Sequence, residues 1–127
     1  MSRLNLLLDT HILLWWLNEN KQLPESARQA ITDAEIVWVS AVSALEIGIK
    51  RASRKLTFEH DLEEQLVINA FRPMPVTVAH AVAAARLPPH HKDPFDRLLI
   101  AQAMCESLTL VTADARIRAY NVPMMLA

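Results

Sequence analysis

The sequence predicts an α/β fold in which a parallel sheet of about five short strands lies between two layers of helices, a three-layer α/β/α sandwich. Short apolar runs alternate along the chain with stretches that have helical periodicity. Uninterrupted apolar runs are typical of strands buried on both faces, and helices usually connect such parallel strands. The chain has 127 residues, enough for one hydrophobic core, so we expect a single domain over 1–127.

The predicted strands are the apolar runs that polar or turn-forming residues bound on either side. In chain order they are LNLLLD (4–9), EIVWVS (35–40), MPVT (74–77), LTLVT (108–112) and VPMML (122–126). Each is short enough for a strand and too short for a separate helix.

Helices are predicted between these strands. Pro24 suits the first turn of the second helix, whereas Pro88 and Pro89 end an alanine-rich one. In chain order the predicted helices cover 10–18, 24–34, 41–52, 59–70, 78–86, 93–106 and a short segment around Ile117.

Composition excludes several classes of protein. Hydrophobic residues make up 52% and charged residues 21%, which is typical of a globular chain. Gly48 is the only glycine, so neither G-x-G-x-x-G nor a Walker A loop can be present. Cys105 is the only cysteine, which excludes an intrachain disulfide and a cysteine-based metal site and fits a reducing cytosol. No apolar run approaches the roughly 20 residues of a membrane span, and the N-terminus lacks signal-peptide features, so we expect a cytoplasmic protein without membrane partners.

Carboxylates occur near the positions where predicted strands end and helices begin. Asp9 ends the first strand, Glu46 lies in the helix after the second, and Asp114 follows the fourth. Asp93 and Asp96 open the helix that leads to the fourth strand. Sites in parallel sheets form at the carboxyl ends of strands, so we expect these acids to meet at one edge of the sheet.

Helix capping is the simpler interpretation of most of these acids. Asp9, Asp93 and Asp114 each stand where a helix begins, and aspartate is a preferred N-cap. Capping explains Glu46 least well, because Ser40 is the better cap and Glu46 then lies more than a turn inside its helix.

A cluster of carboxylates requires compensation. Two bare carboxylates ~4 Å apart repel by up to ~4 kcal/mol at an effective dielectric constant near 20. Such a cluster persists if it is partly protonated or if it holds a hard divalent cation. Mg²⁺ or Mn²⁺, as one or two ions, would suit hydrolysis of a phosphodiester bond.

The acids Asp9, Glu46, Asp96 and Asp114, in that order, resemble those of PIN-domain ribonucleases, specifically the VapC-type toxins of type II toxin–antitoxin systems. The segments that carry the resemblance are LLLDTHILLWWL, SALEIGIK, HKDPFDRLLIAQA and LVTADARI. The resemblance implies a PIN-like sandwich, a homodimer, RNA cleavage dependent on Mg²⁺ or Mn²⁺, and inhibition by a small antitoxin encoded beside the toxin. It also implies that the four acids are catalytic and bind the metal, with Asp93 capping the helix and Asp96 projecting into the site.

Other polar and basic residues near the four acids could support them. Thr10, Ser43 and Thr112 could hydrogen-bond behind the metal ligands, although Thr10 also suits a helix start and Thr112 a structural position in a strand. Arg97 could steer a phosphate or balance the acids, or form a salt bridge. His91 could approach a phosphate, although a solvated loop histidine is the simpler interpretation.

Lys50, Arg51, Arg54 and Lys55 form a basic run that could follow an RNA backbone. A solvated helix end is the alternative, because cations favour helix C-termini.

The run ILLWWL cannot face a single core, because adjacent helical residues point about 100° apart. Leu14, Trp15 and Trp16 could therefore form a surface for an antitoxin or a second subunit. Complete burial under neighbouring helices is the alternative.

Other classes with acids at strand ends fit less well. A receiver domain needs paired acids after the first strand and a lysine after the last, and this chain has neither. A haloacid dehalogenase-like phosphatase needs an aspartate where His11 stands. A catalytically silent PIN-like module that binds protein or RNA stays open as an alternative.

Overall fold

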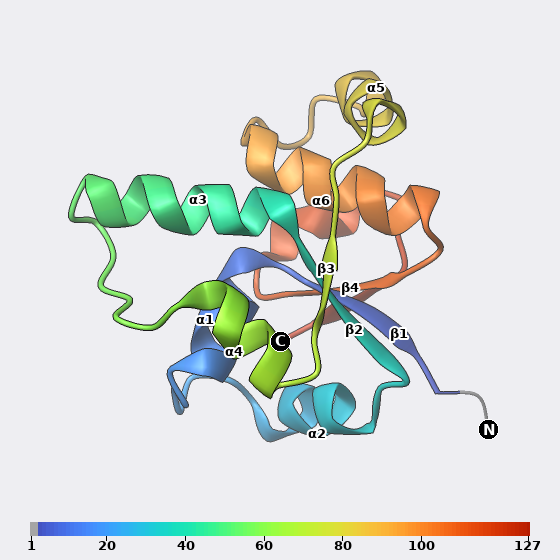
Figure 1. Ribbon diagram of the computed structural model, residues 1–127. Coiled ribbons are helices and arrows are strands. Elements are labelled where there is room, and N and C mark those ends of the chain that lie inside the picture. Colours follow the sequence, from blue (N-terminus) through green and yellow to red (C-terminus); the bar gives the residue numbers. More distant parts are fainter. Residues whose placement is uncertain (1–2) are drawn as a thin grey trace.

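A computed structural model describes residues 3–127 and confirms the predicted α/β/α arrangement (Figure 1). All strand pairs in the sheet are parallel, and the spatial order is β3-β2-β1-β4-β5. The strands are β1 (Asn5–Leu8), β2 (Ile36–Ser40), β3 (Arg72–Met74), β4 (Thr109–Thr112) and β5 (Met124–Leu126). The predicted start of the domain at residue 1 lies outside the described residues.

Helices cover both faces of this sheet. The helices are α1 (Thr10–Leu17), α2 (Glu25–Asp33), α3 (Ala41–Ala52), α4 (Leu62–Ile68), α5 (Val78–Arg86), α6 (Pro94–Cys105) and the 3₁₀ helix η1 (Ala115–Ala119). Figure 1 shows α1, α2 and α4 below the sheet and α6 above it, with α5 on the outer side of α6. None of the helices within 3–127 is long and apolar enough to cross a membrane.

The alternating directions of strand side chains divide the core into two clusters. Leu6 and Leu8 of β1 point into the cluster under α1, α2 and α4, whereas Leu7 packs with Leu99 and Ile100 of α6. All five side chains are fully buried, which explains why the strands are apolar without interruption.

The largest difference from the prediction concerns β3. A strand was expected over 74–77, but the strand covers Arg72–Met74, and Thr77 instead caps α5. Proline is tolerated in an edge strand because its missing N–H faces away from the sheet, so Pro73 does not prevent pairing with Val39. The helix expected over 59–70 is shorter, Leu62–Ile68, because Asp61 caps its start.

Candidate active site

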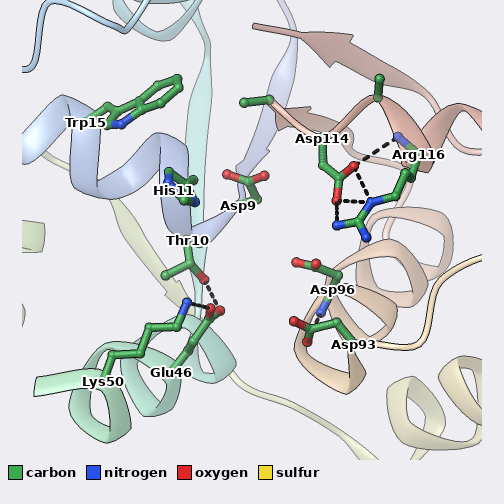
Figure 2. Close-up of a pocket in the computed structure, with 12 residues that line it drawn as sticks. Asp9, Thr10, His11, Trp15, Glu46, Lys50, Asp93, Asp96, Asp114 and Arg116 are labelled. Atoms are coloured by element: carbon green, nitrogen blue, oxygen red, sulfur yellow. Dashed lines mark hydrogen bonds and ion pairs between the residues drawn. The ribbon is translucent and has the colours of Figure 1, made fainter. Parts of the chain in front are cut away.

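The four predicted acids, Asp9, Glu46, Asp96 and Asp114, line one pocket of about 430 Å³ at the carboxyl edge of the sheet. Figure 2 shows their side chains directed into this space from different elements, with Asp93 beside Asp96. The prediction that residues distant in sequence meet here therefore matches the geometry.

Asp9 connects the sheet to the pocket. Its backbone N–H donates to the carbonyl oxygen of Val111 (3.0 Å), which joins the end of β1 to β4. Its carboxylate caps α1 by accepting a hydrogen bond from the Ile12 N–H (2.8 Å). Burial raises the pKa of Asp9, although the Thr112 hydroxyl and the Ile12 N–H act in the opposite direction. Asp9 is therefore both a cap and a wall of the pocket.

Glu46 lies in the second turn of α3, which Ser40 caps as expected. Its Oε1 accepts a hydrogen bond from the Thr10 hydroxyl (2.7 Å), which is also hydrogen-bonded to the Ser43 hydroxyl (2.9 Å). Its Oε2 lies 2.6 Å from Nζ of Lys50, and this contact raises the pKa of Lys50. Thr10 and Ser43 thus orient the Glu46 carboxylate from behind.

At the start of α6, Asp93 caps the helix and Asp96 faces the pocket. Asp93 caps the helix by accepting from the N–H groups of Phe95 (2.8 Å) and Asp96 (3.4 Å), with Pro94 in the first helical position. The Asp96 side chain consequently remains directed into the pocket. Burial, with the charge of Asp93 second, raises the pKa of Asp96 to about 6.

Asp114 caps η1 through the Arg116 N–H (2.9 Å), and its own N–H donates to the Thr112 hydroxyl (3.0 Å). The Arg116 guanidinium donates to both carboxylate oxygens, at 2.9 Å from Nε and 2.7 Å from Nη2. This ion pair holds the pKa of Asp114 well below its usual range.

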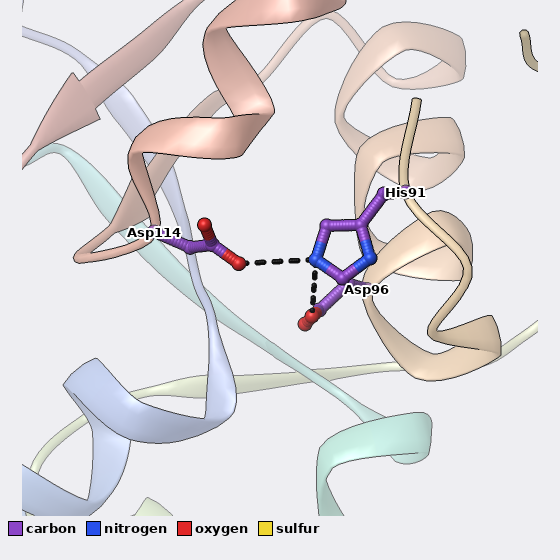
Figure 3. Close-up of side chains that lie close together, drawn as sticks. All are labelled: His91, Asp96 and Asp114. Atoms are coloured by element: carbon purple, nitrogen blue, oxygen red, sulfur yellow. Dashed lines mark hydrogen bonds and ion pairs between the residues drawn. The ribbon is translucent and has the colours of Figure 1, made fainter. Parts of the chain in front are cut away.

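His91 is buried, which contradicts its interpretation as a solvated loop residue. Its Nε2 lies 3.0 Å from Oδ2 of Asp114 and 3.1 Å from Oδ2 of Asp96 (Figure 3). The sequence HHKDP does not indicate that His91 is the buried histidine, because its neighbour His90 has the same residues around it and is exposed.

Arg97 neither balances the acids nor forms a salt bridge within the described part of the chain. Helix rotation directs its guanidinium away from the Asp96 side chain. It donates instead to the Tyr120 hydroxyl and to four backbone carbonyl oxygens, those of Ala84, Leu87, Pro88 and His91. Arg97 therefore fixes the segment that precedes α6.

The basic run divides. Lys50 lines the pocket, whereas the Arg51 guanidinium lies over the Phe58 ring, 5.9 Å from its centroid. Arg54 and Lys55 are exposed just beyond the end of α3. Only Lys50 is thus adjacent to the acids.

Leu14, Trp15 and Trp16 are each half-buried, so neither complete burial nor full exposure describes them. The indole N–H of Trp16 donates to the Asn69 side chain (3.0 Å), and its ring packs against Phe71. Trp15 lines the acidic pocket, with the His11 ring edge-on to it.

The donor set suits a hard divalent cation. Carboxylate oxygens dominate it, as Mg²⁺ and Mn²⁺ require. One carboxylate oxygen each of Asp96 and Asp114 and a ring nitrogen of His91 lie within 4.8 Å of one another, so these two acids are close enough to share an ion. Asp9 is buried and has no ion pair to lysine or arginine in the described part of the chain. A buried carboxylate is costly unless a positive charge lies beside it, and a bound cation would supply that charge.

Comparison with known proteins gives consistent results. The PIN domain family model matches residues 6–123. Ribonuclease VapC22 from Mycobacterium tuberculosis is 34% identical, and the alignment covers 92% of this chain and 92% of that one. VapBC2 from Rickettsia felis, solved bound to a DNA fragment from its promoter, aligns with a TM-score of 0.71 at 14% identity over 97% of this chain and 98% of that one. FitAcB from Neisseria gonorrhoeae aligns with a TM-score of 0.69 at 23% identity over 94% and 96%.

Proposed function

Because the chain belongs to the PIN domain family, we propose that it is a metal-dependent endoribonuclease and the toxin of a toxin–antitoxin pair. The observation that carries the proposal is the convergence of Asp9, Glu46, Asp96 and Asp114 on one pocket. The 34% identity to a ribonuclease over nearly the whole chain supports RNA as the substrate.

The four acids would hold one or two Mg²⁺ or Mn²⁺ ions. Such an ion polarises a phosphate and lowers the pKa of a water molecule. Thr10 keeps the Glu46 carboxylate oriented, and Lys50 and Arg116 supply positive charge for the RNA backbone at opposite walls of the pocket. Trp15 offers an aromatic face on which a nucleobase can stack.

An antitoxin and a second copy of the chain are the proposed protein partners. The structures similar to this chain include VapBC2 and FitAcB, and another is described as a toxin–antitoxin complex from Klebsiella pneumoniae. The half-buried residues Leu14 and Trp16 remain candidates for such a surface. An RNA-cleaving enzyme with one exposed thiol, Cys105, suits the cytoplasm.

The test is RNA cleavage by the purified protein, free of antitoxin, across a series of Mg²⁺ and Mn²⁺ concentrations. We expect cleavage that a chelator abolishes and that Asp9→Asn and Asp96→Asn each remove. Asp61→Asn is the matched control, because Asp61 caps α4 away from the pocket and asparagine caps equally well. Intact RNA at every metal concentration would refute the enzyme and favour the silent binding module, which would keep its partner after the same substitutions.

A further inference from the structure

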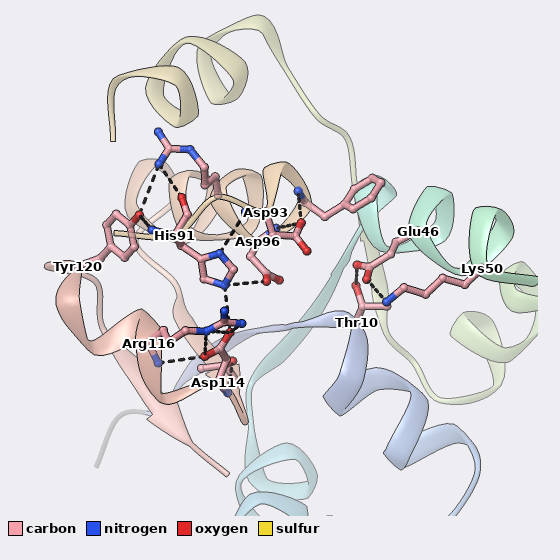
Figure 4. A network of polar contacts seen from close by, with 12 residues as sticks. Thr10, Glu46, Lys50, His91, Asp93, Asp96, Asp114, Arg116 and Tyr120 are labelled. Atoms are coloured by element: carbon pink, nitrogen blue, oxygen red, sulfur yellow. Dashed lines mark hydrogen bonds and ion pairs between the residues drawn. The ribbon is translucent and has the colours of Figure 1, made fainter. Parts of the chain in front are cut away.

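We propose that His91 is a positioning residue, which holds the Asp96 and Asp114 carboxylates at a fixed separation through one shared N–H and does not bind the metal itself. The inference rests on the proposed function for its consequence, since the two acids are proposed metal ligands. Its basis is the set of contacts around the imidazole, which Figures 3 and 4 show.

The backbone determines which ring nitrogen carries the proton. The Asp93 N–H donates to Nδ1 of His91 (3.1 Å), so Nδ1 must be the acceptor. In the neutral ring the proton is then on Nε2, which faces Oδ2 of Asp114 and Oδ2 of Asp96. An Nε2 that donates has no lone pair to offer a cation, so this tautomer excludes His91 from the ligand set.

The ring is held in place at its backbone. The His91 N–H donates to the Tyr120 hydroxyl (2.8 Å), which in turn donates to the carbonyl oxygen of Pro88 (2.8 Å). The Arg97 guanidinium donates to the His91 carbonyl oxygen (3.1 Å). The imidazole therefore enters the pocket from a segment that is fixed at both its N–H and its C=O.

Asp96 and Asp114 need such a bridge because they come from different segments. Asp96 is on α6 and Asp114 is in the turn between β4 and η1, so no shared element fixes their separation. Like charges move such carboxylates apart unless a donor lies between them. One N–H shared by the two carboxylates supplies that donor and occupies one oxygen of each.

His80 offers a matched control within the same chain. It is also buried, its Nδ1 accepts from the Thr77 N–H (3.0 Å), and its Nε2 lies 3.0 Å from Oε1 of Glu106. This arrangement repeats the chemistry of His91 outside the acidic pocket. Substitution of His80 therefore reports the general effect of losing a buried histidine.

The experiment combines ¹⁵N NMR of the histidine rings with Mg²⁺ titration calorimetry. In the wild type we expect Nε2 of His91 to be protonated without metal and to remain protonated at saturating Mg²⁺. His91→Phe keeps an aromatic ring but loses both the Nε2 donor and the Nδ1 acceptor of the Asp93 N–H, and we expect Mg²⁺ affinity to fall by roughly 10- to 100-fold. His91→Gln keeps an N–H donor and should bind within about threefold of wild type, whereas His80→Phe should lower the melting temperature without changing the affinity.

Two results would overturn the inference while the proposed function stands: loss of the Nε2 proton on Mg²⁺ binding, or wild-type affinity in His91→Phe. If His91→Phe does not fold, the ¹⁵N NMR measurement of the His91 tautomer in the wild-type protein, with and without Mg²⁺, tests the inference by itself. A wild type that binds no divalent ion and cleaves no RNA refutes the proposed function itself.

Discussion

Asp96→Asn should stabilise the metal-free protein at neutral pH while abolishing cleavage. The folded state raises the pKa of Asp96 from 3.8 to about 6. As pH rises, this carboxyl ionises first in the unfolded state, so between pH 3.8 and about 6 the folded state binds more protons and stability falls. Above this window the full cost of the buried charge is present.

The magnitude follows from the shift. About two pKa units correspond to roughly 3 kcal/mol. The Asp96 side chain retains 24% of its exposure, so solvent screens part of this cost. We therefore expect a gain of about 1.5 kcal/mol, or roughly 5 °C in melting temperature, for Asp96→Asn above pH 7. Asparagine Oδ1 can still accept from Nε2 of His91, so little else is lost.

The assay is thermal and urea unfolding with a chelator present, at pH values from 4 to 8. The gain should shrink towards zero as pH falls to 4, because Asp96 is then protonated in the folded state and about half protonated in the unfolded state. Asp61→Asn should change stability little at any pH. Adding Mg²⁺ at ~100 times its dissociation constant should stabilise wild type by about 2.7 kcal/mol and Asp96→Asn much less. An unchanged or lower stability of chelated Asp96→Asn at pH 7.5 would refute the reasoning.

Three further predictions concern the pocket and its surroundings. Asp9→Asn keeps the cap of α1 and removes a buried charge with a raised pKa, so chelated protein should melt higher while an RNA cleavage assay shows loss beyond ~100-fold. Thr10→Val removes the hydroxyl behind Glu46, and urea unfolding should show a loss of about 1–2 kcal/mol with cleavage reduced about tenfold; unchanged stability would contradict this. Changing Arg54 and Lys55 together to glutamine should weaken RNA binding similarly for different RNA sequences. In filter binding, the slope of the logarithm of the binding constant against the logarithm of salt concentration should fall in magnitude by about one or two.

Apolar pattern predicted the fold well wherever a strand is buried on both faces. β1 and β4, in the middle of the sheet, were expected within a residue of their observed bounds. β3 was misplaced because it is an edge strand with two exposed residues and Pro73 in its centre. Its backbone pairs with β2 regardless, and that pairing depends on tertiary position, which local pattern does not encode.

The acids were predictable because topology brings their segments together. Asp9 and Asp114 follow β1 and β4, which are neighbours in the sheet, so their convergence follows from the parallel order. From the sequence, helix capping and pocket formation were alternative interpretations of these acids. Asp9 and Asp114 do both, because one carboxylate oxygen caps the helix while the carboxylate also faces the pocket. Arg97 and His91 could not be placed, because their partners are backbone atoms and side chains distant in sequence.

The distribution of positive charge indicates where in the pocket a cation is most needed. Glu46 and Asp114 each have a cationic partner from their own segment, Lys50 and Arg116. Asp9 and Asp96 have no such partner in the described chain, and these are the two acids whose pKa is raised. At Asp96 the influence of His91 lowers the pKa, but burial and the charge of Asp93 outweigh it. The unbalanced negative charge therefore lies between the end of β1 and the start of α6, and an ion bound there lowers the energy of both carboxylates at once.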